Sequence, residues 1–189
     1  MATQALAFVF PGQGAQYVGM GKDFAEAFPE VREVFAQADE ALDFSIRELC
    51  FHGPEDELTK TENTQPAILT VSCALLELVR RHTSLVPRFV AGHSLGEYSA
   101  LVAAEVLSFP DAVRIVRRRG ELMEAAVPAG TGGMAAVIGL THEEVAALCA
   151  EVSENYGPVE PATLNAPGQT VIAGSAEALQ VAVDKVKAA

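Results

Sequence analysis

Residues 92 to 96 of this 189-residue chain, Gly-His-Ser-Leu-Gly, have the types and the spacing of a serine nucleophile on a sharp turn. In this G-x-S-x-G pattern the serine lies between a strand and a helix, and its hydroxyl is exposed for attack on a carbonyl. The two glycines permit the tight backbone and the close approach of a substrate. A small-residue turn of an α/β fold has the same pattern, so the pentapeptide alone leaves both interpretations open.

A second candidate lies on the helix that we predict between Ser108 and Val127. At 100° per residue, Arg119 falls at the centre of an apolar stripe formed by Ala112, Val116, Met123 and Ala126. The stripe excludes the neighbouring arginines, which we expect to be solvated: Arg114, Arg117 and Arg118. Because a guanidinium that faces an apolar interior needs an anion, Arg119 either pairs with an internal Asp or Glu or binds a substrate carboxylate in a bidentate contact.

The segments around the serine fit a nucleophile elbow. Residues 88–91 predict a short buried strand, and residues 95–107 predict a mostly apolar helix. Residues 5–10, Ala-Leu-Ala-Phe-Val-Phe, are a continuous apolar run that is typical of a central parallel strand buried on both faces. The turn-forming residues 11–14, Pro-Gly-Gln-Gly, follow this strand as a loop.

Helices are predicted for most of the remaining first part of the chain. Helical patterns cover residues 20–28, 30–42 and 44–50, and residues 64–81 predict a long apolar helix with Pro66 tolerated in its first turn. Ser108 is predicted to cap the next helix, with Pro110 and Asp111 in its first turn.

The pattern changes after residues 128–133, Pro-Ala-Gly-Thr-Gly-Gly, and predicts a β-α-β-β-α order. We expect strands at residues 134–140, 160–165 and 170–174, a helix from a capping box at Thr141 and Glu144 to near Gly157, and a last helix from Ser175 to Ala189. This order is most of a ferredoxin-like unit, which needs one more strand, so the sequence looks cut short. We expect two domains, residues 1–129 and 130–189.

Composition restricts the function classes. The formal net charge of −12 makes nucleic acid an unexpected partner, and an acidic partner would need a local basic patch such as the arginines at 114–119. No apolar run approaches the ~20 residues of a membrane helix, and the N-terminus lacks the basic start of a signal peptide. The cysteines at 50, 73 and 149 are odd in number and widely spaced, which favours core packing in a reducing compartment over disulfides or a metal cluster. We therefore expect a cytoplasmic protein.

Four motifs in order resemble the malonyl-CoA:acyl carrier protein transacylases. They are residues 10–16 (Phe-Pro-Gly-Gln-Gly-Ala-Gln), residues 92–98 (Gly-His-Ser-Leu-Gly-Glu-Tyr), Arg119-Gly120, and residues 165–169 (Asn-Ala-Pro-Gly-Gln). The resemblance covers essentially the whole chain. It implies an α/β fold in which an α/β-hydrolase-like subdomain with a parallel sheet carries an inserted ferredoxin-like small subdomain, both incomplete at the C-terminus.

The resemblance also implies roles for single residues. Ser94 would take the malonyl group as an ester, and Arg119 would bind the free carboxylate of malonate. The backbone N–H groups of Gln13 and Leu95 would form the oxyanion hole, and Leu95 opens a helix whose N-terminus favours negative charge. Gln65 and Asn165 would line the same pocket. Thr163 departs from the family pattern, in which many relatives have a second asparagine.

The family's general base is a histidine, and the resemblance places it past Ala189. A serine hydroxyl is a weak nucleophile without such a base. We interpret the histidines of this chain as ordinary structural or surface residues: His52, His82, His93 and His142. The polypeptide is therefore expected to carry one half of a catalytic dyad.

Together these observations predict an acyltransferase of fatty acid biosynthesis with a ping-pong mechanism. Malonyl-CoA would acylate Ser94, and the pantetheine thiol of acyl carrier protein would then accept the malonyl group. We expect no metal, cofactor, nucleic-acid partner or membrane. Two alternatives stay open: a serine hydrolase, because esterases share the elbow, and a non-catalytic fragment that binds CoA or carrier protein, because the base is missing. Against the hydrolase, Arg119 suits an acidic acyl group, and residues 10–16 differ from the glycine-rich loop of lipases.

Overall fold

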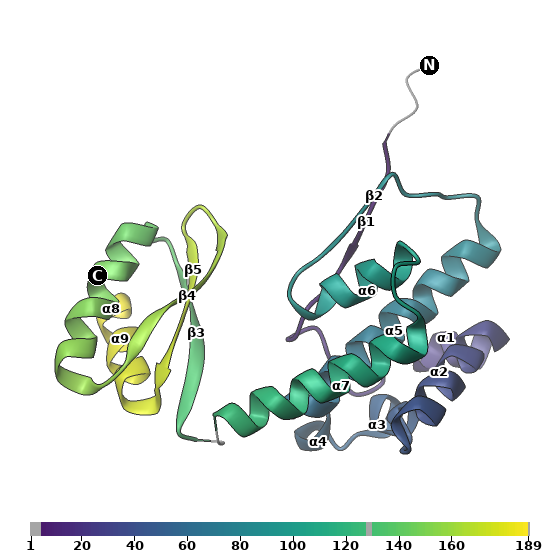
Figure 1. Ribbon diagram of the computed structural model, residues 1–189, viewed down its shortest axis with the longest axis horizontal. Coiled ribbons are helices and arrows are strands. Elements are labelled where there is room, and N and C mark those ends of the chain that lie inside the picture. Colours follow the sequence, from purple (N-terminus) through teal and green to yellow (C-terminus); the bar gives the residue numbers. More distant parts are fainter. Residues whose placement is uncertain (1–4, 128–129, 189) are drawn as a thin grey trace. The chain divides into compact units, whose positions relative to one another are not determined.

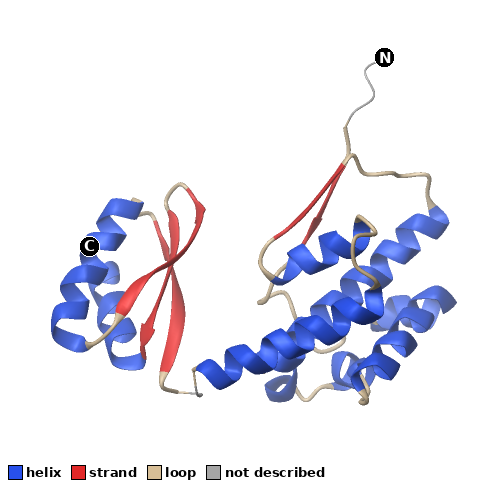
Figure 2. Cartoon of the chain, in the orientation of Figure 1, coloured by secondary structure: helices blue, strands red, loops and turns tan. Residues whose placement is uncertain are grey.

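The computed structural model describes residues 5–127 and 130–188, and the chain divides into two compact units between Glu124 and Ala125. The first unit is a small parallel sheet packed with helices, and the second is an antiparallel sheet with two helices (Figures 1 and 2). The protein is therefore a mixed α/β chain with two separate sheets.

The first unit has two parallel strands, β1 (Ala7–Phe10) and β2 (Phe89–Gly92), in a register that pairs Phe10 with Gly92. Its helices are α1 (Lys22–Ala27), α2 (Pro29–Leu42), α3 (Ile46–His52), α4 (Glu55–Thr59), α5 (Thr61–His82), α6 (Leu95–Ala103) and α7 (Phe109–Ala126). The sequence predicted all of these except the short α4. The Ser108 hydroxyl accepts a hydrogen bond from the Asp111 N–H at 3.3 Å, which confirms the predicted cap of α7.

Only one face of the β1–β2 sheet is packed within the described chain. Phe8, Phe10 and Val90 form a small core with Leu76 of α5 and Ala100 of α6. On the other face, the side chains of Val9 and Phe89 are 75% and 61% exposed. The prediction that the first strand is buried on both faces is therefore wrong for this chain, because the described helices cover one face and leave the alternate side chains in solvent.

Two helix boundaries differ from the sequence prediction. α5 begins at Thr61 rather than Thr64, so Pro66 lies in the second turn instead of the first. α6 ends at Ala103 rather than Leu107, because Glu105 adopts a left-handed backbone (φ 60°) that a helix does not accommodate. The main core lies where α2, α3 and α5 meet, and it contains Phe35, Ile46 and Leu69 with no measurable exposure.

The second unit has the element order that the sequence predicts. It contains β3 (Gly132–Ile138), α8 (His142–Tyr156), β4 (Val159–Ala166), β5 (Gln169–Ser175) and α9 (Ala176–Ala188), and the antiparallel strand order is β3-β5-β4. The capping box of Thr141 and Glu144 is present at the start of α8. Val137, Val145 and Ile172 belong to the core between the sheet and the helices. The predicted boundary at residues 128–133 lies in part outside the described residues.

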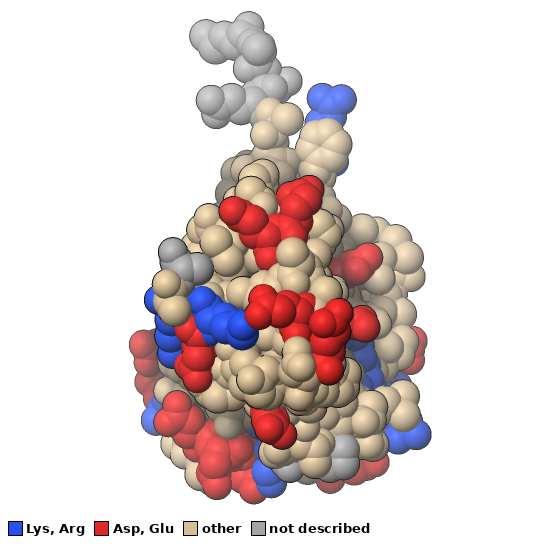
Figure 3. All heavy atoms as spheres, turned by 90° about the vertical axis from the view of Figure 1, so that its left-hand side faces the viewer, with Lys and Arg blue, Asp and Glu red and all other residues tan. Residues whose placement is uncertain are grey.

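No helix of the described residues is both long and apolar enough to span a membrane. The described residues also contain no group of three or more His, Cys, Asp or Glu side chains that could hold a metal ion. Acidic side chains are spread over the face of the molecule in Figure 3, in keeping with the net charge of −12.

Candidate active site

Ser94 lies on a strained turn between β2 and α6. Its backbone angles are φ 52° and ψ −107°, a conformation that costs a non-glycine residue of the order of 1–3 kcal/mol and persists only where the surroundings enforce it. Its hydroxyl makes no capping hydrogen bond with α6. Strand, strained serine and helix are the context that distinguishes a nucleophile elbow from an ordinary turn.

Three close backbone approaches explain the glycines around this turn. A Cβ on Gly92 would lie 2.0 Å from the backbone of Gly96, and a Cβ on Gly96 would lie 2.3 Å from the carbonyl oxygen of Phe10. A Cβ on Gly12 would lie 2.6 Å from the carbonyl oxygen of His93. Only glycine fits at these positions. The start of α6 therefore lies in close contact with the end of β1, and the loop after β1 lies in close contact with the turn.

Two candidate backbone donors belong to segments that meet at this turn. Leu95 is the first residue of α6, and Gln13 belongs to the loop that contacts the turn through Gly12. Among the described residues, neither the Gln13 nor the Leu95 N–H donates to a backbone carbonyl of a turn, loop or cap. The side chain of Gln13 points to the start of α5, where its Nε2 donates to Thr61 Oγ1 at 3.4 Å. Unused N–H groups next to a nucleophile can stabilise an oxyanion.

Arg119 reaches Ser94 from α7. Its Nη2 donates to Ser94 Oγ at 3.1 Å, and its Nη1 donates to Gln65 Oε1 at 2.6 Å. The guanidinium carbon lies 5.8 Å from the centre of the Tyr98 ring, a cation–π distance. The structure thus brings together three residues that the sequence nominated from separate segments, and it adds Tyr98, which the sequence did not single out.

The partners of Arg119 are neutral. No Asp or Glu among the described residues forms an ion pair with Arg119, whereas Arg114, Arg117 and Arg118 all do. Of the two interpretations that the sequence left open, an internal salt bridge is excluded for the described chain. A guanidinium with neutral partners beside a serine hydroxyl can accept the carboxylate of a bound molecule.

The apolar stripe predicted for α7 is correct only in the first half of the helix. Ala112 and Val116 are buried together with Val113 and Gly120, but Met123 is 43% exposed and Ala126 is exposed. The last turns of α7 extend past the core, so helical periodicity alone overestimates the buried face. Arg119 itself is half-buried at the margin of the core.

Gln65 is held in one orientation. It lies in the second turn of α5 with no exposed surface, and its Nε2 contacts the sulfur of Met123 at 3.3 Å while its Oε1 accepts from Arg119. Asn165 lies in β4 of the second unit and is exposed there. The first unit alone therefore supplies Ser94, Arg119, Gln65 and the two backbone donors.

Two cysteines and two histidines of the described chain are buried or paired with acidic residues. Burial raises the pKa of Cys50 and of Cys73 to about 12, so neither is a thiolate at neutral pH. His52 Nδ1 lies 3.0 Å from Glu48, and His82 is hydrogen-bonded to Glu30. His142 is the first residue of α8, and the backbone of His93 contacts the Gly12 loop.

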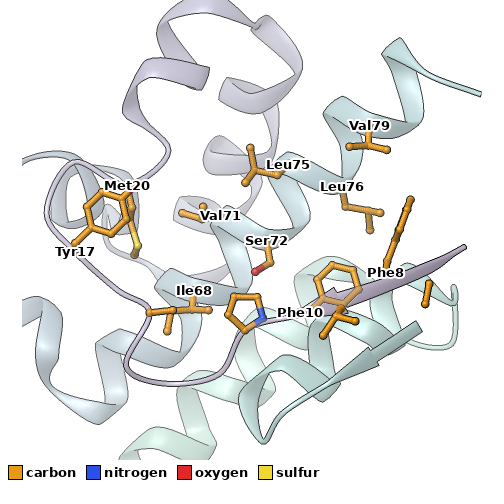
Figure 4. A pocket seen from close by; sticks show the side chains of 14 residues that line it. Phe8, Phe10, Tyr17, Met20, Ile68, Val71, Ser72, Leu75, Leu76 and Val79 are labelled. Atoms are coloured by element: carbon orange, nitrogen blue, oxygen red, sulfur yellow. The ribbon is translucent and has the colours of Figure 1, made fainter. Parts of the chain in front are cut away.

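A cavity of about 470 Å³ lies between β1 and α5. Figure 4 shows its apolar lining, with Phe8 and Phe10 on one side and Ile68, Ser72 and Leu76 on the other. Neither Ser94 nor Arg119 lines this cavity. The candidate site is therefore defined by the chemistry around Ser94 and not by the volume of this cavity.

Residues 7–189 match the family model described as acyl transferase domain. The chain is 50% identical over 182 residues to the malonyl CoA-acyl carrier protein transacylase of Bacillus subtilis (strain 168), covering 96% of this chain and 57% of that protein. It is 51% identical over 183 residues to the protein of the same name from Escherichia coli (strain K12), covering 97% and 59%. The chain thus spans somewhat less than three fifths of the length of these relatives.

Solved structures agree with the sequence relatives. The malonyl CoA-acyl carrier protein transacylase from Coxiella burnetii superposes with a TM-score of 0.92 at 43% identity, covering 98% of this chain and 58% of that one. A malonyl-transacylase in complex with its type II PKS acyl-carrier protein has a TM-score of 0.91 at 48% identity, covering 98% and 60%.

Proposed function

The chain belongs to the acyl transferase domain family, and from this premise we propose that it carries the nucleophile and the carboxylate-binding arginine of a malonyl-CoA:acyl carrier protein transacylase. One observation carries the proposal: the Arg119 guanidinium donates to Ser94 Oγ at 3.1 Å and has no acidic partner among the described residues. An unpaired cation beside a nucleophile suits an acyl group that bears its own negative charge.

In the first half-reaction, Ser94 Oγ attacks the thioester carbonyl of malonyl-CoA. The new C–O bond converts the carbonyl oxygen into an oxyanion, for which the N–H groups of Gln13 and Leu95 are the proposed donors. Each well-placed donor of this kind lowers the barrier by about 3 kcal/mol. The C–S bond then breaks, and the hydroxyl proton of Ser94 ends on the sulfur of the departing CoA.

Arg119 would orient the acyl group during this step. In a malonyl group the free carboxylate is attached through one methylene to the carbonyl carbon that Ser94 attacks. A guanidinium in contact with Ser94 Oγ can therefore bind that carboxylate while the carbonyl meets the nucleophile. Gln65 would hold Nη1 in place, since its amide is fixed by Met123.

In the second half-reaction, the pantetheine thiol of acyl carrier protein attacks the ester carbon. A C–S bond forms, the C–O bond to Ser94 breaks, and the thiol proton returns to Ser94 Oγ. The choice of malonyl-CoA and carrier protein, and of fatty acid biosynthesis as the setting, is supported by the names of the relatives and by the neighbour solved with a carrier protein. We include Asn165 in the proposed pocket because of the resemblance alone.

The finer fold assignment belongs to the same proposal. We assign residues 1–129 to an α/β-hydrolase-like subdomain and residues 130–189 to a ferredoxin-like one. The parallel β1–β2 pair, followed by the strained serine and α6, supports the first assignment. The order β3-α8-β4-β5-α9 with a β3-β5-β4 sheet supports the second. A cytoplasmic location is likewise proposed from the widely spaced cysteines.

Mass spectrometry of the protein incubated with malonyl-CoA tests the proposal. We expect a malonyl ester on the peptide that contains Ser94, lost in Ser94→Ala, and transferred to the thiol of added carrier protein. Ser99→Ala is a matched control, because Ser99 lies on α6, the helix that follows Ser94, and its buried hydroxyl has no hydrogen-bond partner in the described chain. Release of free malonate without transfer would instead indicate a hydrolase. An adduct that survives Ser94→Ala would refute the assignment.

A further inference from the structure

Arg117 differs from the solvated arginine that the sequence predicts. Its side chain is 24% exposed, compared with 58% for Arg114 and 67% for Arg118. Arg114 and Arg118 form ion pairs within their own helix, with Asp111 and Glu121. Arg117 also pairs with Glu121, but the rest of its guanidinium is directed across to α5. It therefore links the two helices that carry Arg119 and Gln65.

The link is a set of directed contacts. Nη1 of Arg117 donates to the backbone carbonyl of Glu62 at 3.1 Å and also to Asn63 Oδ1, and Nη2 lies 3.7 Å from the Glu62 carboxylate. Nε donates to Glu121 at 3.1 Å, and the guanidinium lies 5.2 Å from the centre of the Phe44 ring. Every edge of the planar group is thus in use, which restricts its rotation.

Pro66 explains why the carbonyl of Glu62 needs this donor. In a helix the carbonyl of residue 62 would accept from the N–H of residue 66, and proline has none. Because α5 begins at Thr61, this open carbonyl lies inside the helix rather than before it. Arg117 supplies the missing hydrogen bond from α7, so the position of α7 is tied to one particular carbonyl of α5.

The backbones of the two helices meet at the same residue. A Cβ on Gly120 would lie 2.5 Å from the Cα of Glu62, so α7 crosses α5 with no side chain between them. Arg117 and Gly120 are three residues apart and share one face of α7. Arg119 lies between them in sequence and reaches Gln65, three residues beyond Glu62.

We propose that Arg117 is a positioning residue for Arg119: its bond to the Glu62 carbonyl that Pro66 leaves open fixes α7 on α5 and so aims the Arg119 guanidinium at Ser94. Among the described residues, Arg119 has only neutral hydrogen-bond partners, so the direction of its guanidinium depends on the position of α7. Arg117 acts through the backbone and has no contact with Ser94. The inference takes its substrate, malonyl-CoA, from the proposed function. The contacts of Arg117 and Arg119 that support it do not depend on that function.

The acylation of Ser94 by malonyl-CoA and by acetyl-CoA gives one test. In Arg117→Met, a shifted α7 misaligns the bidentate contact with the malonyl carboxylate, so the preference for malonyl over acetyl should fall by about tenfold or more. Arg118→Met is the matched control, since it removes a neighbouring arginine that pairs with the same Glu121, and it should leave the preference unchanged. Arg117→Lys should restore the preference only in part, because an ammonium group lacks the planar fork.

A double mutant tells whether Arg117 acts by positioning Arg119 or only by stabilising the fold. In an Arg119→Ala background, Arg117→Met should not change the malonyl preference further. An equal loss for both substrates, or an undiminished effect in the Arg119→Ala background, would overturn the proposal. Should Arg117→Met not fold, Arg117→Lys serves in its place, because its ammonium group lacks the planar fork and should lower the malonyl preference in part.

A readout without substrate distinguishes this inference from the proposed function. In nitrogen-15 NMR spectra of the arginine side chains, the Arg119 signals should shift in folded Arg117→Met and stay in place in Arg118→Met. Wild-type protein that is not acylated at all would refute the proposed function, and the Arg119 signals would still test the positioning. Unchanged Arg119 signals in folded Arg117→Met would refute the positioning role.

Discussion

Replacing Arg119 by alanine should change which acyl group Ser94 accepts. In the free protein, the guanidinium donates to two neutral oxygens, Gln65 Oε1 and Ser94 Oγ. A malonyl carboxylate would replace at least one neutral acceptor with a charged one, and a hydrogen bond to a charged group contributes about 1.5–3 kcal/mol. The malonyl acylation rate should therefore fall by about 10- to 150-fold.

Acetyl-CoA provides the internal comparison, because an acetyl group has no carboxylate. Its acylation rate should fall only by the few-fold that the hydrogen bond from Arg119 to the uncharged Ser94 Oγ contributes. The assay is the rate of Ser94 ester formation, measured by intact-protein mass spectrometry with each acyl-CoA. Arg119→Lys should recover little of the malonyl rate, since a point charge does not reproduce two parallel N–H donors.

Arg118→Ala controls for the loss of positive charge on α7. Arg118 is exposed and pairs with Glu121, so its removal should leave both rates close to those of the wild type. Equal losses for malonyl and acetyl in Arg119→Ala would refute the reasoning and show that Arg119 only supports the elbow. A large selective loss in Arg118→Ala would show that the general field of the helix matters more than the contact.

Two further predictions concern the frame of the site and its pH dependence. Gly96→Ala should lower the free energy of unfolding in urea by about 1–3 kcal/mol and slow the acylation of Ser94, because the new Cβ would lie 2.3 Å from the Phe10 carbonyl oxygen. Gly133→Ala is the control, because its Cβ would meet only the end of the Leu179 side chain. It should change neither the stability nor the acylation rate. Glu30 is hydrogen-bonded by its own backbone N–H and by His82, which holds its pKa below the usual 4.5. The stabilising effect of the Glu30 carboxylate is therefore complete above about pH 5, and it is lost as the pH falls through the folded-state pKa of Glu30. In urea unfolding between pH 7 and pH 3, the free energy of unfolding should fall less in Glu30→Gln than in the wild type. An equally steep loss in Glu30→Gln, or a Gly96→Ala protein that unfolds and reacts like the wild type, would contradict these predictions.

The parts of the fold that the sequence predicted correctly depend on neighbours within a few residues. The caps at Ser108 and Thr141 follow from hydrogen bonds that span three residues. The elbow at Ser94 is local only in part: Gly92 contacts Gly96 within the turn, but Gly96 also contacts the end of β1, which is distant in sequence. Helical periodicity also gave the direction of Arg119 toward the core, because Val116 and Gly120 beside it are buried.

The incorrect predictions of burial concern what a segment touches far along the chain. The apolar run of β1 indicates burial on both faces, but the described chain covers only the face with Phe8 and Phe10. Met123 was assigned to the core by its spacing, and it instead lies half-exposed against Gln65, 58 residues away. Periodicity gives the direction of a side chain and not the extent of the surface that covers it.

A signal for the role of Arg117 is present in the sequence, but it lies on α5 and not on the helix that carries Arg117. Spacing alone does not distinguish Arg117 from the other arginines of its helix. One of its partners is a backbone carbonyl, and any residue type can present a backbone carbonyl. The signal is Pro66: a proline inside a helix, rather than in its first turn, leaves the carbonyl four residues earlier without a donor. A carbonyl left open inside a helix can take its partner from another element, and a long side chain with several donors on a crossing helix can supply it. Because α5 begins at Thr61, a donor for this carbonyl has to reach Glu62 from outside the helix, and the Arg117 side chain does so.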